Sequence, residues 1–88
     1  MPLSKSDIQS AIKQKVVELA EAMGSDAQDL TFDEIIPASG FIDSAALLEL
    51  IAWFEARYGI SIPAADLTID NLGSATQMAD YLLRRLQA

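Results

Sequence analysis

The amino-acid sequence predicts an all-α fold, a four-helix bundle with three longer helices, one short third helix and a long first loop. Three stretches repeat apolar residues at three- and four-residue spacing, which is typical of amphipathic helices. No alternation of apolar and polar residues is long enough to found a sheet. The 88 residues provide for one hydrophobic core, so residues 1–88 are expected to form a single domain.

The first long helix is expected to begin at Ser6, because Ser6-Asp7-Ile8-Gln9 fits the capping-box pattern. Gly24 is a natural C-terminal stop for it. The apolar stripe between these two points consists of Ile8, Ile12, Val16, Leu19 and Met23.

The long loop is expected between Ser25 and Phe41, where no helical period persists and Pro37 and Gly40 interrupt the chain. The segment around Asp33 to Ile36 allows one helical turn. The loop carries too many apolar side chains to leave in water, so it is predicted to fold over the bundle as a partial lid. These side chains are Leu30, Phe32, Ile35, Ile36, Phe41 and Ile42.

The second long helix is expected from Ser44 to Tyr58, with Asp43 as its N-cap and Gly59 at its end. A helical wheel places one apolar face of this helix toward the core. The face consists of Leu47, Leu50, Ile51, Phe54 and Tyr58. The opposite face carries mostly small side chains and consists of Ala45, Glu49, Ala52 and Ala56. Leu48, Trp53 and Glu55 lie on the flanks.

The short third helix is expected around Ala64 to Leu67 or slightly later, because Pro63 suits a first helical turn. The last helix is expected to follow Ser74-Ala75-Thr76-Gln77, a second capping box. Its apolar stripe consists of Met78, Ala79, Leu82 and Leu86, and its last turn carries Arg84 and Arg85, where a helix dipole favours cations.

The composition excludes most kinds of enzyme. The chain has no histidine and no cysteine, so it lacks the commonest general base, the commonest metal ligand and any thiolate. We therefore expect no catalytic residue and no metal site. No apolar run is long enough to span a membrane and the first residues do not form a secretory signal, so we expect a cytoplasmic protein, as a monomer.

The formal net charge of −7 is concentrated in the middle of the chain. Residues 25–56 hold no lysine or arginine, and their acids are Asp26, Asp29, Asp33, Glu34, Asp43, Glu49 and Glu55. Such a surface repels phosphate backbones and anionic lipids, so basic proteins are expected as partners, and neither nucleic acid nor a membrane. The alternative is that the acidic surface only keeps a small domain soluble.

Ser44 is the one nucleophile at a distinctive place, directly after Asp43 at the opening of the second long helix. Ser and Asp at a helix start are usually caps. The first helical turn nevertheless favours an attached phosphate, through its unpaired N–H groups and the positive end of the helix dipole. The chain offers no base to activate this hydroxyl, so Ser44 is expected to be modified by another protein.

The chain resembles the acyl carrier protein family, which includes the peptidyl and D-alanyl carriers, over nearly its whole length. The family's attachment motif is similar to Gly-x-Asp-Ser-Leu-x-x-x-Glu-Leu, and residues 40–50 read Gly-Phe-Ile-Asp-Ser-Ala-Ala-Leu-Leu-Glu-Leu, with one extra residue after Gly40. Residues 54–63, residues 65–74 and residues 78–82 are similar to the family's helix-two exit, third-helix segment and last helix. This ordered set is more specific than an Asp-Ser pair alone.

The resemblance implies an acyl-carrier-like bundle that is a single carrier domain and not an enzyme. A phosphopantetheinyl transferase would attach a phosphopantetheine arm from coenzyme A to Ser44, and the arm's thiol would hold cargo as a thioester. A loading ligase or acyltransferase and downstream condensing or transferring enzymes would then read the second helix. The partner surface that it implies consists of Asp43, Ala45, Leu48, Glu49, Ala52, Glu55 and Ile62.

Two departures from the family pattern favour a specialised carrier, for a dedicated ligase or a lipid, polyketide or nonribosomal-peptide-type pathway. Ala45 stands where fatty-acid carriers usually have leucine, and Ala46 follows it, which makes the helix start less acidic. Phe54 and Trp53 would favour short or amino-acid cargo if they fill the interior; ordinary packing is the alternative.

Two other functions stay open from the residues alone. An unmodified acidic helical interaction module explains the charge and the bundle, but not the position of Asp43 and Ser44. A small enzyme would need paired carboxylates such as Asp33 and Glu34, or Asp66 and Asp70, and acids on polar loops usually face solvent.

Overall fold

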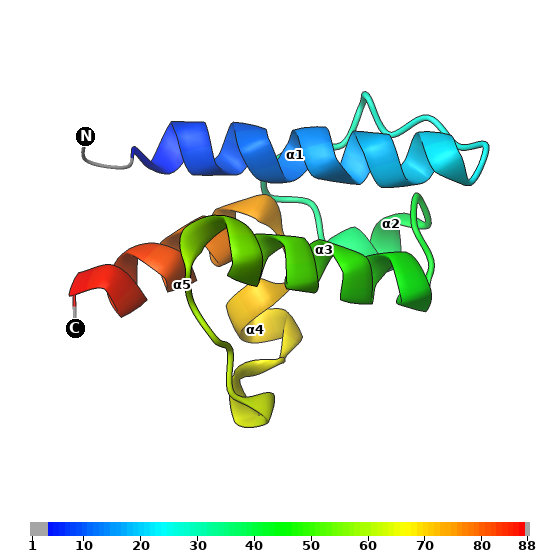
Figure 1. Ribbon diagram of the computed structural model, residues 1–88. Coiled ribbons are helices and arrows are strands. Elements are labelled where there is room, and N and C mark those ends of the chain that lie inside the picture. The colour runs from blue at the N-terminus through cyan, green and yellow to red at the C-terminus, as the bar shows by residue number, and fades with distance from the viewer. Residues whose placement is uncertain (1–3, 88) are drawn as a thin grey trace.

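The computed structural model describes residues 4–87, and these residues form helices and loops with no strand. The α-helices are α1 (Lys5–Ala22), α2 (Ile36–Ser39), α3 (Ser44–Tyr58), α4 (Ile69–Leu72) and α5 (Ala75–Gln87), and a 3-10 helix, η1 (Ala64–Asp66), precedes α4 (Figure 1). The predicted all-α fold with three longer helices is confirmed. The expected short third helix consists of two pieces, η1 and the single turn α4, and the long first loop contains α2.

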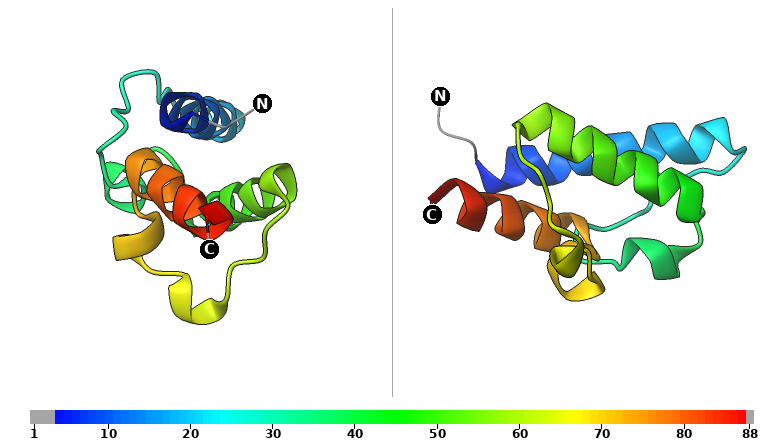
Figure 2. Two further views of the ribbon diagram at one scale, coloured as in Figure 1. Left: turned by 90° about the vertical axis from the view of Figure 1, so that its left-hand side faces the viewer. Right: turned by 60° about the horizontal axis from the view of Figure 1, so that its bottom comes forward.

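The three long helices pack around one core. Helix α1 packs against α5 and α3, and α4 packs against α5. An end-on view shows the three long helices together, with η1 and α4 on the side away from α1 (Figure 2). The start of α3 lies at one end of the molecule, and both described chain ends lie at the other (Figure 1). No helix within residues 4–87 combines the length and the apolar character needed to cross a membrane.

The N-cap of α1 lies two residues earlier than the capping box at Ser6 predicts, so that prediction is wrong. Ser4 is the N-cap, because its Oγ accepts a hydrogen bond from the N–H of Asp7 (3.1 Å), which places Ser6 inside the first turn. The end of the helix agrees with the prediction, since Gly24 follows it with a positive φ of 83°.

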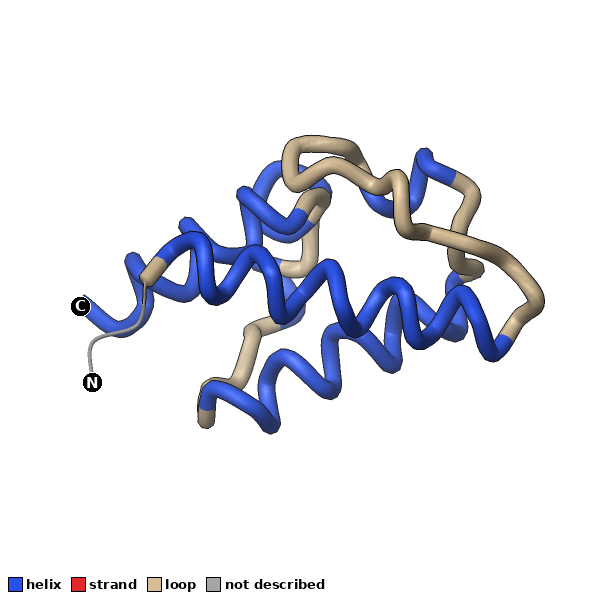
Figure 3. The backbone as a smooth tube through the Cα atoms, turned by 90° about the horizontal axis from the view of Figure 1, so that it is seen from above, coloured by secondary structure: helices blue, strands red, loops and turns tan. Residues whose placement is uncertain are grey.

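The long first loop folds over the bundle as predicted, crossing beside α1 (Figure 3). Leu30 and Ile36 are buried, and two backbone hydrogen bonds tie the loop to the junction of α4 and α5. The N–H of Ile36 donates to the carbonyl of Gly73 (2.7 Å), and the N–H of Thr76 donates to the carbonyl of Phe32 (2.9 Å). The helical turn expected around Asp33 to Ile36 is found three residues later, as α2, because Pro37 suits the start of a helix.

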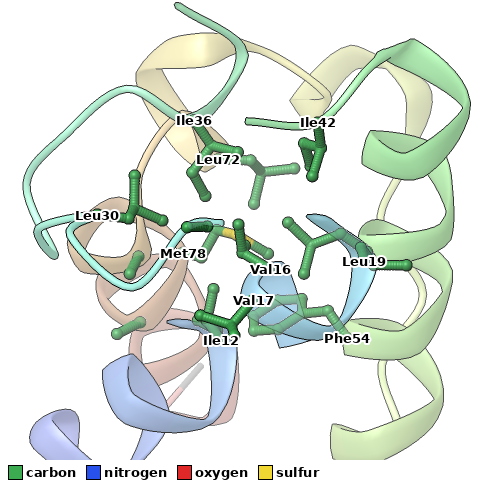
Figure 4. Close-up of a cluster of buried hydrophobic side chains, with 14 of the residues drawn as sticks. Ile12, Val16, Val17, Leu19, Leu30, Ile36, Ile42, Phe54, Leu72 and Met78 are labelled. Carbon is green, nitrogen blue, oxygen red and sulfur yellow. The ribbon is translucent and has the colours of Figure 1, made fainter. Parts of the chain in front are cut away.

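The core is built from all long helices and the loop. Figure 4 shows Ile12, Val16, Val17 and Leu19 of α1 facing Leu30, Ile36, Ile42, Phe54, Leu72 and Met78. On α3, Ala46, Leu50 and Phe54 are buried, whereas Leu47, Ile51 and Tyr58 are half-buried. The predicted face is thus rotated slightly toward Ala46. Trp53 is half-buried, as expected for a flank position.

The last helix begins at its predicted cap. Ser74 Oγ accepts a hydrogen bond from the N–H of Gln77 (3.1 Å), but Gln77 Oε1 is buried without a partner among the described residues, so only half of the capping box forms. Gly73, just before the cap, has no room for a side chain, because an added Cβ would lie 2.5 Å from the carbonyl oxygen of Ile69. The turn from α4 into α5 is therefore closely packed.

The segment of residues 59–71, which we call the strap, differs from the rest of the fold. It leaves the end of α3, passes through η1 and enters α4, and none of its residues is buried. It projects from the bundle on the side away from α1 (Figure 2). Polar side chains attach it to α5: Tyr81 donates its hydroxyl to Asp66 Oδ2 (2.7 Å), and Arg85 donates to the Tyr81 oxygen (2.8 Å).

These contacts make the stability depend on pH. Burial of the Tyr81 hydroxyl raises its pKa above the usual 10.0, and the Asp66 carboxylate raises it further, while Arg85 lowers it. A raised pKa in the folded state means that the stabilisation is complete below pH 10.0 and is lost as the pH rises through the folded-state pKa. We expect the urea midpoint of the wild type to fall toward that of Tyr81→Phe above about pH 10. Unfolding of both proteins is followed by Trp53 fluorescence. A difference between their urea midpoints that stays constant from pH 8 to 11 would contradict this expectation.

Candidate functional site

Ser44 lies at the first position of α3, held there by its neighbour. Asp43 is the N-cap, and its Oδ1 accepts a hydrogen bond from the N–H of Ala46 (2.8 Å). The Asp43 carbonyl accepts from the N–H of Leu47 (2.9 Å). Ser44 itself is exposed. The sequence therefore predicted the local geometry, with Asp43 fixing the helix start and Ser44 open to solvent.

The first turn of α3 offers free donors beside the Ser44 hydroxyl. Asp43 satisfies the N–H groups of Ala46 and Leu47, whereas those of Ser44 and Ala45 have no acceptor within residues 4–87. Together with the positive end of the helix dipole, they stabilise negative charge placed on the Ser44 oxygen. A phosphodiester at this oxygen thus fits the electrostatics of the site.

An open hollow lies directly beside Ser44. It has a volume of about 250 Å³ and is lined by Pro37, Ile42, Asp43, Ser44 and Leu47. A second hollow, of about 110 Å³, shares Pro37 and Leu47 with it and continues along α3 past Ile51 toward Leu67 and Ile69 of the strap. The hollow next to the hydroxyl therefore has both polar and apolar walls, the second hollow is mainly apolar, and both are open enough for a flexible arm.

Four of the residues predicted to meet partners share the exposed surface of α3. Ala45, Leu48, Glu49 and Ala52 are all exposed, and Leu48 is the most open large apolar side chain of the described residues, with 65% of its surface accessible. The area around them is acidic and small-sided, with Leu48 as its one large apolar group.

Asp43, the N-cap described above, is also exposed, and the remaining two predicted residues, Glu55 and Ile62, contact each other. Glu55 Oε2 accepts a hydrogen bond from the backbone N–H of Ile62 (2.7 Å), and both residues are half-buried. Glu55 therefore anchors the strap to α3 with one carboxylate oxygen, so it is less free to meet a partner than Glu49.

Sequence reasoning did not predict that residues of the strap line a hollow next to α3. Leu67 and Ile69 are 45% and 56% exposed, and with Pro37 and Leu47 they line the second hollow, which adjoins the one beside Ser44. The available signal was two large apolar residues between polar ones, in Leu67-Thr68-Ile69-Asp70, where no helical stripe continues. The contact of Asp66 with Tyr81 and Arg85 was also missed, because it joins positions far apart in the chain.

Comparison with known proteins defines the class to which this helical bundle belongs. The phosphopantetheine attachment site family matches residues 14–82, which include Ser44, all of α3 and the strap. The chain is therefore a carrier protein with a covalently attached phosphopantetheine group, and not an enzyme.

A curated relative specifies the family further. The chain is 33% identical over 81 residues to the acyl carrier protein of Streptomyces coelicolor, and the match covers 86% of each chain. This protein belongs to the acyl carrier protein family. No solved structure matches the chain.

Proposed function

We propose that the phosphopantetheine arm is attached to Ser44, and that this chain is a single carrier domain which holds cargo as a thioester. A phosphopantetheinyl transferase would join the Ser44 oxygen to the phosphate of the arm, with coenzyme A as donor and adenosine bisphosphate as leaving group. The observation that carries this proposal is the exposed Ser44 hydroxyl at the first turn of α3, capped by Asp43. Because the chain has no histidine, the base that removes the hydroxyl proton would come from the transferase.

The exposed surface of α3 is the proposed docking site for the enzymes that load and unload the arm. These would be a ligase or acyltransferase, and then condensing or transferring enzymes. Leu48 supplies an apolar contact, while Asp43 and Glu49 supply negative charge. Residues 25–56 hold no basic side chain, so partners with basic docking surfaces fit best.

A specialised pathway suits this surface better than general fatty-acid synthesis. The small side chains of Ala45 and Ala52 project little from the helix surface on both sides of Leu48. A partner would therefore meet Leu48, the large apolar side chain, one turn beyond Ser44. A partner adapted to a large side chain directly after the serine would lose that contact here. We propose a cytoplasmic monomer that serves a dedicated ligase.

The attachment is tested by incubating the purified chain with coenzyme A and a broad-specificity phosphopantetheinyl transferase. Intact mass should rise by one phosphopantetheine, and fragmentation should place the added mass on the peptide that contains Ser44. No gain in mass, or a gain on another serine such as Ser10 or Ser61, would contradict the proposal and favour an unmodified interaction module.

A further inference from the structure

We propose that Asp66, Tyr81 and Arg85, together with the link between Glu55 and Ile62, form a latch that holds the strap closed and thereby limits the apolar cargo sheltered beside Ser44 to short chains. The part that concerns cargo rests on the proposed function. The part that concerns the latch is a property of the chain itself, with or without the arm.

The strap has little apolar packing to keep it in place. All thirteen residues from Gly59 to Asn71 are exposed or half-buried, and η1 buries none of its side chains. Only Ile60 and Ile62 pack partly against the core. Segments with few buried contacts open locally at a much lower free energy than the whole fold. Polar links must therefore supply much of the closure.

Those links are few and specific. At the first half of the strap, Glu55 Oε2 accepts from the N–H of Ile62 (2.7 Å). At its centre, Asp66 Oδ2 accepts from the hydroxyl of Tyr81 (2.7 Å), which in turn accepts from Arg85 (2.8 Å). Tyr81 is only 4% exposed, so its ring is packed into the bundle and holds the hydroxyl in a fixed position. Hydrogen bonds that involve charged groups are the stronger ones.

Both ends of the strap are well defined. Gly59 ends α3 in the left-handed conformation, with a φ of 67°, and reverses the chain there. At the other end, Leu72 is buried and Gly73 is too closely packed for a Cβ, while its carbonyl accepts from Ile36. The strap can therefore move as a unit between a chain reversal and a fixed anchor.

The closed strap forms one wall of the apolar hollow nearest to the core. Leu67, Thr68 and Ile69 face Leu47 and Ile51 of α3 across a volume of about 110 Å³. A cavity of about 150 Å³ holds a benzene molecule, so this hollow holds an apolar group of roughly four carbon atoms. Leu72 and Gly73, which also line this hollow, are buried, so a longer chain can extend further inward only if the strap moves.

The first test follows amide hydrogen exchange in the unmodified chain. Tyr81→Phe removes the hydroxyl but keeps the ring, and we expect roughly tenfold faster exchange of the protected strap amides, such as those of Ile62, Asp66 and Asn71. Amides of α1 should not change. Tyr58→Phe is the matched control, because the Tyr58 hydroxyl makes no hydrogen bond within residues 4–87, and it should leave the strap unchanged.

Two results of this test would overturn the latch. One is unchanged strap exchange in Tyr81→Phe. The other is an equal increase in the strap and α1, which would mean that Tyr81 supports the whole bundle. Glu55→Ala provides an independent variant at the other link and should also speed exchange of the strap, while Glu55→Gln, whose amide oxygen still accepts from Ile62, should do so less.

The second test loads the arm with butyryl or octanoyl groups, using a broad-specificity transferase and the corresponding acyl coenzyme A. In the wild type and Tyr58→Phe, octanoyl should leave the methyl NMR signals of Leu50 and Leu72 close to those of the butyryl form. In Tyr81→Phe, octanoyl should shift them strongly. Equal shifts in all three proteins would overturn the cargo limit. Failure of loading itself would contradict attachment at Ser44, and the exchange test would still decide on the latch.

Discussion

Ser44→Ala is expected to gain no mass at all in the presence of coenzyme A and a phosphopantetheinyl transferase, while the wild type gains one phosphopantetheine. The substitution removes the only oxygen that the site presents for the phosphodiester. It should not disturb the fold, because Ser44 is exposed and the cap of α3 belongs to Asp43. Alanine is also the better helix former at this position. The melting temperature should therefore stay within a few degrees of the wild type.

Ser10→Ala is the matched control for this experiment, since Ser10 is likewise an exposed serine in a long helix. It should be modified as completely as the wild type. Residual modification of Ser44→Ala would show that another hydroxyl accepts the arm. A Ser44→Ala protein that loses its helical circular dichroism would point to a structural role for the hydroxyl and against a site built for modification.

Leu50→Ala and Leu48→Ala are the same change at two positions of α3. We expect the first to lower the stability and the second to weaken recognition by partner enzymes. Leu50 is fully buried, so its truncation leaves a cavity and should cost about 2–5 kcal/mol of unfolding free energy. For a domain of this size, that lowers the melting temperature by roughly 10 °C or more. Leu48 is 65% exposed, and its truncation should change the stability by less than about 0.5 kcal/mol.

In assays of modification and loading, Leu48→Ala is expected to have the larger effect of the two. Leu48→Ala should slow transfer of the arm, or loading by a partner, because it removes the large apolar group of the exposed surface. Leu50→Ala, measured at a temperature where it remains folded, should be modified at close to the wild-type rate. Fluorescence of Trp53, the single tryptophan, follows unfolding in both. A Leu48 variant that is modified and loaded at the wild-type rate would place the docking surface elsewhere.

Local signals in the sequence predicted much of the fold. The cap at Asp43 and the reversal at Gly59 depend on one or two residues each, and both are confirmed. The start of α1 was misplaced because Ser4 and Ser6 are both acceptable caps, and the bond from Asp7 to Ser4 decides between them only in three dimensions. The apolar periods predicted the buried positions Leu50 and Phe54 for the same local reason.

The interactions of the strap were not predictable in this way. A helical wheel places Glu55 on a flank of α3, but it does not show that the chain returns and brings the N–H of Ile62 to that carboxylate. The pairing of Asp66 with Tyr81 likewise depends on how η1 lies against α5. Patterns with a helical period describe neighbours on one helix, whereas these contacts join separate elements.

The arrangement of the chain ends has a practical consequence. The described N- and C-terminal ends lie at the same end of the bundle, and the start of α3 lies at the opposite end (Figure 1). A tag, a resin or a fused partner joined at either end would therefore stand well away from Ser44. Protein immobilised through either end should present Ser44 and the start of α3 to the solution, which suits surface-based capture of the enzymes that recognise it.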